Sequence, residues 1–245
     1  MNRRTVGVAL ALLGLAATTQ VGAQDEETDA VKFTIDAGFA NTSGNSDITT
    51  VTGGQTISYT AGHFVLSQAF DVLFNQTDDS TTAEAYKGNV RGDRFFGSAE
   101  RLSVFLDLRG SRNRFAGISR RAEQALGVAY DVVKTEKNIV AVEGAATLVQ
   151  QRGTNGVDNN FPAALVGARY RHHFTPDATF TVKGEYIPNL ERSNDYRLIG
   201  EAKILAPLSG KIAIAFSYMV RFDNVPEPGF QKTDKFLTSG IQISL

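Results

Sequence analysis

The chain has 245 residues, of which 42% are hydrophobic and 21% are charged, and it contains no Cys and no Trp. The absence of Cys excludes disulfide scaffolds, thiolate metal sites and cysteine nucleophiles. Twenty-five Lys and Arg residues against 26 Asp and Glu residues give a net charge of −1, so no overall field would attract nucleic acid. No apolar run approaches the ~20 residues that a membrane-spanning helix needs, which excludes a helical membrane protein.

The first part of the chain has the organisation of a secretory signal peptide. A short basic segment (residues 2–4) precedes an apolar stretch (6–17), and small residues follow at 21–23. A buried first helix would not explain this order of basic, apolar and small segments. We therefore expect residues 1–23 to be a signal peptide that is removed after export, and residues 24–30 to be a flexible, acidic start of the mature chain.

From residue 31 onward, hydrophobic residues recur at every second position. Val31, Phe33 and Ile35, for example, alternate with Lys32 and Thr34. A period of two places each hydrophobic set on one face of a β-strand, and the i, i+3, i+4 spacing of a helix does not compete with it. The sequence therefore predicts an all-β fold with about 12 strands. The expected strands cover residues 31–41, 48–59, 64–75, 82–95, 101–110, 119–133, 138–151, 161–174, 179–187, 195–205, 211–222 and 233–245.

The strand lengths and the connections favour a transmembrane barrel over a soluble periplasmic β-sandwich. Most segments are longer than the ~5–6 residues of an average strand and suit the ~9–11 residues that a tilted strand needs to cross a bilayer. Every second connection is short, at 60–63, 96–100, 134–137, 175–178 and 206–210. The other connections are longer and more polar, at 41–47, 76–81, 111–118, 152–160, 188–194 and 223–232. Outer-membrane barrels combine an even strand number with short periplasmic turns and longer external loops.

We therefore expect residues 31–245 to form a single antiparallel up-and-down barrel in the outer membrane, with both termini in the periplasm. The end of the chain resembles the C-terminal assembly signal of such barrels, with Gly240 followed by Ile243 and Leu245. Leu245 departs from the signal, in which the last residue is usually aromatic. The resemblance implies that the barrel-insertion machinery and periplasmic chaperones handle the chain, and the barrel fold implies contact with outer-membrane lipid and lipopolysaccharide.

The charged stripes of the strands are expected to face the barrel interior. Arg or Lys on the lipid face would cost ~2–4 kcal/mol each near the bilayer midplane, which forces this orientation. Two interpretations of the lumen stay open: charge pairs that fill a narrow barrel, or a hydrated pore for small polar or charged solutes. Basic residues gather on the later strands, which would favour anions in a pore, although Glu185 and Glu201 lie among them and the inward charges are nearly balanced in sign. The candidate lumen residues are Arg91, Arg109, Arg121, Glu143, Arg169, Arg171, Lys183, Glu185, Arg197, Glu201, Lys203 and Arg221.

A barrel enzyme that acts on envelope lipid is the alternative function. His63 falls in a predicted periplasmic turn, and His172 and His173 lie near the periplasmic end of a strand. A general base must lie within hydrogen-bond reach of its nucleophile, and none of these residues lies at the outer rim where lipid would arrive. We therefore expect no catalytic residue, no cofactor and no metal site, and a narrow channel or a passive envelope component as the function.

Several motifs resemble the YdiY-like family of salt-induced outer-membrane proteins, whose domain has no known function. These motifs are Gly-Asn-Ser-Asp at 44–47, Tyr-Lys-Gly at 86–88 and the Asn-Val-Pro-Glu-Pro-Gly-Phe-Gln-Lys-Thr-Asp stretch at 224–234, of which the last is the most specific. The resemblance covers nearly the whole mature chain. It implies an outer-membrane barrel, and because the family has no agreed activity it assigns no role to any residue.

Overall fold

The computed structural model describes residues 30–43, 48–77 and 80–244. The expected signal peptide (residues 1–23), the Gly-Asn-Ser-Asp motif (44–47) and Leu245 lie outside these residues, so the expectations for them stay predictions. Ala30, which we expected in the flexible segment, is the first residue of a strand. No helix in the described part of the chain is long and apolar enough to cross a membrane.

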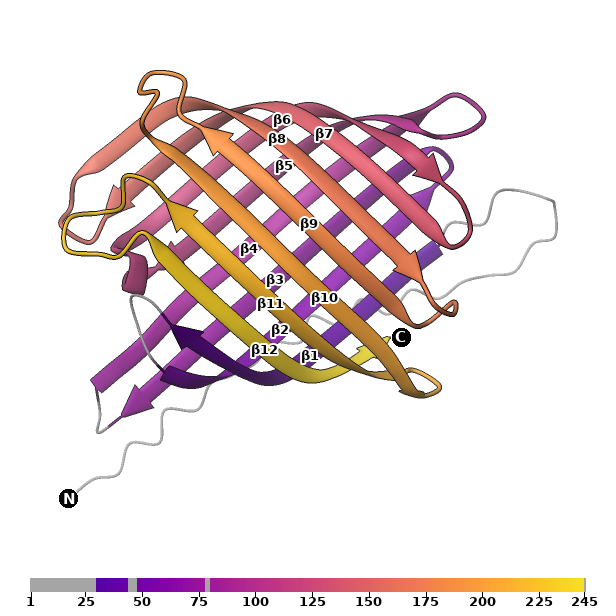
Figure 1. Ribbon diagram of the computed structural model, residues 1–245, viewed down its shortest axis with the longest axis horizontal. Coiled ribbons are helices and arrows are strands. Elements are labelled where there is room, and N and C mark those ends of the chain that lie inside the picture. Colours follow the sequence, from indigo (N-terminus) through magenta and orange to yellow (C-terminus); the bar gives the residue numbers. More distant parts are fainter. Residues whose placement is uncertain (1–29, 44–47, 78–79, 245) are drawn as a thin grey trace.

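Twelve antiparallel strands form one closed barrel, in which each strand pairs with its neighbours in sequence and β1 pairs with β12 (Figure 1). The predicted all-β barrel is therefore confirmed, and each strand lies within a few residues of its expected position. The strands are β1 (Ala30–Ser43), β2 (Ile48–Ala61), β3 (Phe64–Thr77), β4 (Ser80–Phe96), β5 (Leu102–Asn113), β6 (Ile118–Lys134), β7 (Asn138–Gly153), β8 (Asp158–His173), β9 (Thr179–Pro188), β10 (Tyr196–Ser209), β11 (Ile212–Asp223) and β12 (Thr233–Ser244). A single 3₁₀ turn, η1 (Arg114–Ala116), joins β5 to β6 within the described residues.

Several connections are shorter than the sequence predicted. We call the end at which β1 starts and β12 stops the terminal end, and the opposite end the loop end. The predicted loops at 76–81, 111–118 and 152–160 are too long, because strand pairing continues into these polar residues. Gln76 still pairs with Thr81, and Gln151 pairs with Asn159. Polar composition marks where the strands leave the apolar part of the barrel, and it does not stop their hydrogen bonding.

The outer wall of the barrel is apolar and the inner wall is largely polar. Four apolar side chains of β5 are 40–48% exposed: Leu102, Val104, Leu106 and Leu108. The side chains between them are only 1–2% exposed: Ser103, Phe105 and Asp107. Exposed leucines around buried polar groups invert the arrangement of a soluble protein, and they fit a barrel whose outer surface contacts lipid.

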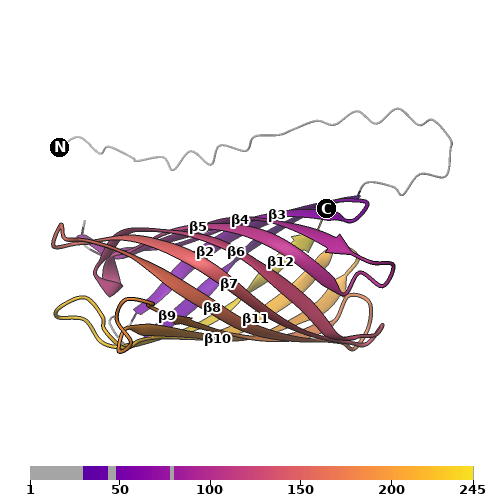
Figure 2. The ribbon, with the colours of Figure 1, turned by 90° about the horizontal axis from the view of Figure 1, so that it is seen from above.

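The barrel is flattened rather than round. Figure 1 looks along the shortest axis, with β8–β11 in front of β2–β5, and Figure 2 shows how close these two walls are. The walls meet at two corners, β12–β1 and β6–β7, which lie on opposite sides of the ring of strands.

Glycines that face the interior allow the wall to bend at these corners. Gly38 pairs with Gly240 across β1 and β12, and a Cβ atom at Gly240 would lie 2.5 Å from the carbonyl oxygen of Ala37. At the other corner, a Cβ atom at Gly127 would lie 2.6 Å from the Cβ atom of Ala145. A side chain has no room at either position, so glycine is required there for the close approach of two backbones.

Candidate functional site in the barrel interior

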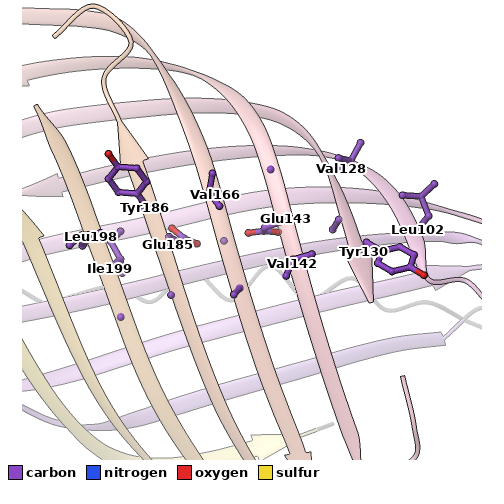
Figure 3. Close-up of a pocket in the computed structure, with 16 residues that line it drawn as sticks. Leu102, Val128, Tyr130, Val142, Glu143, Val166, Glu185, Tyr186, Leu198 and Ile199 are labelled. Atoms are coloured by element: carbon purple, nitrogen blue, oxygen red, sulfur yellow. The ribbon is translucent and has the colours of Figure 1, made fainter. Parts of the chain in front are cut away.

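Two ion-pair groups bridge the middle of the lumen. Arg91 on β4 contacts Glu143 on β7 at 2.9 Å and also its own strand's Asp93 at 3.0 Å. Arg109 on β5 contacts Glu185 on β9 at 2.8 Å, although the two strands are four positions apart around the barrel. Figure 3 shows Glu143 on β7 and Glu185 on β9 near one another. The flattening of the barrel makes such short bridges between opposite walls feasible.

A second set of polar contacts lies nearer the loop end. Arg197 on β10 contacts Glu123 on β6 at 2.6 Å, and both residues are 8% exposed. Arg121 on β6 donates to Gln151 Oε1 at 2.6 Å and lies 3.8 Å from Asp223 on β11. The Arg197–Glu123 and Arg121–Asp223 contacts join β6 to strands across the barrel. Gln151 instead pairs with Arg121 from the neighbouring strand β7. The contacts across the barrel fix the distance between the walls and leave little space between them.

Apolar side chains fill the interior beside these ion pairs. The buried cluster contains Val149, Phe161, Ala163, Leu165 and Ile187. The polarity pattern of the sequence predicted only charged and polar residues for the lumen, and the structure adds this cluster to them. The signal was present in the sequence, since Phe161–Val166 is apolar at successive positions, as in strands that are buried on both faces.

The connection between β11 and β12 folds across the loop end of the barrel, where Figure 1 draws it in yellow. We call residues 224–232 the mouth segment. Glu227 accepts a hydrogen bond from Gln151 Nε2 on β7 at 2.6 Å. The ring of Phe230 packs against Gly117, where a Cβ atom would lie 2.6 Å from Phe230 Cε2.

Local hydrogen bonds hold the base of the mouth segment in place. Asn224 Nδ2 donates to the carbonyl oxygen of Asn194 at 2.7 Å, and Lys232 Nζ donates to Asn224 Oδ1 at 3.0 Å. The segment thus reaches from β11 and β12 to β7 and the β5–β6 connection on the far side of the mouth. It is the same stretch that carries the most specific part of the family resemblance.

Towards the terminal end, the inner faces of β8 and β9 are open to water, although Ser103 and Phe105 on the inner face of β5 are buried there. Lys183 is 38% exposed and contacts Glu201 at 2.9 Å, while Asp71 on β3 is exposed although it faces inward. Arg169 is exposed and Arg171 is half-buried. Among the described residues, no side-chain hydrogen bond or ion pair reaches either of these two arginines.

The predicted lumen residues all occupy inward positions of their strands, but their surroundings differ. Most of them form ion pairs: Arg91, Arg109, Arg121, Glu143, Lys183, Glu185, Arg197 and Glu201. Lys203 instead donates to Gln242 Oε1 at 3.4 Å, and Arg221 lies over the ring of Phe236 with 5.0 Å between its Cζ atom and the ring centre. The remaining two are Arg169 and Arg171. The sequence could not indicate which of these side chains contact one another.

The histidines occupy the terminal end and the outer wall. His63 Nδ1 lies 2.6 Å from Glu100 Oε1 between two turns at the terminal end. The ring of His172 packs edge-on against Phe174, with 4.6 Å between ring centres, and its Nδ1 lies 2.9 Å from Asn138 Oδ1. Carboxylate, amide and aromatic groups therefore surround these rings, and the contacts place neither ring at the loop end.

A hollow of about 740 Å³ lies on the outer side of the β6–β10 wall (Figure 3). Gly144, Gly184 and Gly200 form its floor, and larger side chains such as Tyr130 and Tyr186 stand around it. Glu143 and Glu185 are also among the residues that line the hollow, but their carboxylates contact arginines in the interior. The hollow therefore belongs to the lipid-facing surface and not to the lumen.

Three solved structures share the fold. The NanC porin has a TM-score of 0.60 at 10% sequence identity, with 86% of this chain and 100% of that chain covered. The COG4313 outer membrane channel from Pseudomonas putida F1 has a TM-score of 0.53 at 10% identity, with 92% and 100% covered. The KdgM porin in complex with disordered oligogalacturonate has a TM-score of 0.51 at 13% identity, with 86% and 99% covered. At these identities the likeness establishes the barrel fold alone.

Sequence comparison assigns the family. No curated protein matches the chain. The profile of a family described as "Protein of unknown function, DUF481" matches residues 35–244, which is nearly all of the barrel. The mouth segment and all twelve candidate lumen residues lie within this match. The chain therefore belongs to the DUF481 family of proteins of unknown function, as the resemblance of its motifs predicted.

Proposed function

We propose that the protein is an outer-membrane barrel that forms a narrow channel for small polar or anionic solutes and is closed at the loop end by its mouth segment. The main support is a change of surface along the inward face of β8. From the loop end to the terminal end this face carries Phe161, Leu165, Arg169 and Arg171. A packed apolar region thus gives way to water-accessible cations within one strand.

The outer-membrane location rests on the apolar outer wall and on the shared barrel fold. We propose that both termini lie in the periplasm, that lipid and lipopolysaccharide surround the wall, and that the insertion machinery and periplasmic chaperones recognise Gly240, Ile243 and Leu245. The packing at Gly240 gives this residue a second role, because it also permits closure of β12 against β1.

The names of the structural relatives favour a channel over an enzyme. NanC is a porin, the Pseudomonas protein is a channel, and the KdgM porin was solved with oligogalacturonate, a polyanion. A porin-like fold whose β8 carries Arg169 and Arg171 on its inner face supports the proposal of anionic solutes for this chain. We further propose that the protein is not an enzyme, since the histidines that could act as general bases lie away from the loop end.

A passive envelope component is the second candidate function. The observation that favours it is the set of ion pairs between opposite walls, above all Arg109 with Glu185 and Arg197 with Glu123. These contacts fill the cross-section of the flattened barrel in the way that a permanently closed structural barrel requires. The two candidates differ in whether ions cross the barrel.

Single-channel recording separates the two functions. The refolded protein without residues 1–23 is inserted into a planar bilayer with a salt gradient across it. A channel gives discrete current steps, with a reversal potential that indicates anion preference. A correctly inserted barrel without steps supports the passive component. In a conducting barrel, Arg169→Glu with Arg171→Glu should shift the reversal potential towards cations, and an unchanged value would mean that these side chains do not line the path.

A further inference from the structure

Arg169 and Arg171 are neighbours on the inward face of β8. Two residues along a strand span about 6.6 Å, so both guanidinium groups project into the same part of the lumen. Arg169 lies in register with Lys183 on β9, and Arg171 lies in register with Thr181. The wall at this level therefore carries three cations on two adjacent strands.

Five other lumen cations have a carboxylate close by, whereas Lys203 contacts an amide oxygen and Arg221 an aromatic ring. Arg91, Arg109, Arg121, Lys183 and Arg197 each contact Asp or Glu within 4 Å. In the described part of the chain, no carboxylate lies within that distance of Arg169 or Arg171.

Two adjacent guanidinium groups repel each other, and partial burial strengthens this repulsion because the effective dielectric constant is lower than in water. An oxyanion placed between them would relieve the repulsion. Guanidinium groups bind carboxylate and phosphate with paired, charge-assisted hydrogen bonds, and a multiply charged ligand would engage both arginines at once. Lys183, which is 38% exposed, could add a third contact while it stays near Glu201.

We propose that Arg169 and Arg171, with Lys183 beside them, form a binding site in the terminal half of the lumen for solutes that carry at least two phosphate or carboxylate charges. This inference rests on the proposed function in that it names the solute class of the same lumen. The side chains project inward, so the ligand is a dissolved anion rather than the headgroup of a surrounding lipid.

Calorimetric titration of the refolded mature barrel in neutral detergent tests the site, with inorganic pyrophosphate and citrate as probes. We expect both anions to bind. Arg169→Gln with Arg171→Gln should weaken binding at least about tenfold, because it removes two charge-assisted contacts. Arg169→Lys with Arg171→Lys should retain part of the affinity, because it keeps the charges but loses the paired geometry.

Arg112→Gln with Arg114→Gln is the matched control. It removes two arginines at the same spacing, but near the loop end, where Glu84 contacts both of them. The control should bind within about twofold of the unmodified barrel, since those arginines are already paired. Far-ultraviolet circular dichroism and the gel shift of unheated samples establish that each variant is folded.

Three results would overturn the site: no binding of either anion to the folded barrel, equal binding by the Arg169/Arg171 variant, or an equal loss in the control. A titration with dihexanoyl phosphatidylglycerol tests the lipid source, and binding of this lipid without binding of pyrophosphate would also overturn the solute site. Conductance separates the two proposals. If the barrel binds anions but passes no current, the binding site is supported and the channel is contradicted. If the barrel conducts but binds no anion, the channel is supported and the binding site is contradicted.

Discussion

The two halves of the inner wall formed by β8–β10 contrast in packing. Near the loop end, Arg197 and Glu123 form an ion pair at 8% exposure beside the apolar cluster of Phe161 and Leu165. Near the terminal end, the inner wall carries exposed Arg169 and half-exposed Lys183. The same alternation of residues along β8 thus produces a packed surface at one end of the strand and a water-accessible surface at the other. The period of two determines which side chains face inward. The flattening of the barrel and the size of the side chains determine whether water reaches them.

Breaking the buried ion pair is the largest effect that we predict. Glu123→Ala should destabilise the barrel by roughly 3–5 kcal/mol, because it leaves the Arg197 charge buried without its partner. Urea unfolding of the refolded protein in lipid vesicles measures this difference. Lys183→Ala in the open half removes a partly exposed pair and should cost less than about 1 kcal/mol. Equal losses for the two variants would remove the distinction between the halves.

Adding a side chain at a corner should have the next largest effect. Gly127→Val places a side chain against Ala145 and Phe105, and such overpacking typically costs about 1–3 kcal/mol. Gly184→Ala is the control, since nothing lies within 4 Å of a Cβ atom there. Unfolding of both variants in the same vesicles gives the comparison. A rounder barrel would accommodate the valine, so an unchanged stability at position 127 would contradict the flattened cross-section.

Releasing the mouth segment should have a small effect on stability and a clear effect on permeation. Glu227→Ala removes the acceptor of the Gln151 hydrogen bond and should cost about 1 kcal/mol. If the segment closes the loop end, this variant should pass current more often or at larger amplitude than the unmodified barrel. Asn155→Ala, in the neighbouring β7–β8 connection, serves as the control. Identical recordings from the Glu227 variant would mean that the closure lies deeper, at the buried ion pairs.

Much of the fold could be predicted because one physical rule controls it. A strand between lipid and lumen must alternate in polarity, so Val31 to Ile35 on β1 and Leu102 to Leu108 on β5 indicated both the strand and its orientation. The rule fails at β8, where Phe161–Val166 is apolar on both faces because the inner face packs against other side chains instead of water.

The contacts across the lumen could not be predicted. Arg109 and Glu185 belong to strands that are not neighbours, and only the flattening brings them within 2.8 Å. Flattening in turn depends on inward glycines such as Gly127 and Gly38. In the sequence, these glycines only interrupt the alternation of a strand, and they do not indicate that two backbones approach closely there. The mouth segment was noted as a family motif, but its contact with Gln151 depends on how a loop folds across the barrel mouth.

Cysteine accessibility tests the division of the lumen most directly, because the chain contains no cysteine of its own. Single substitutions Arg169→Cys and Leu165→Cys place a thiol on the same inward face of β8, four residues apart. We predict that a charged, water-soluble thiol reagent modifies position 169 in the refolded barrel at least about 100-fold faster than position 165, because only the former reaches water. Equal rates at the two positions would contradict a lumen that is packed near the loop end and open near the terminal end.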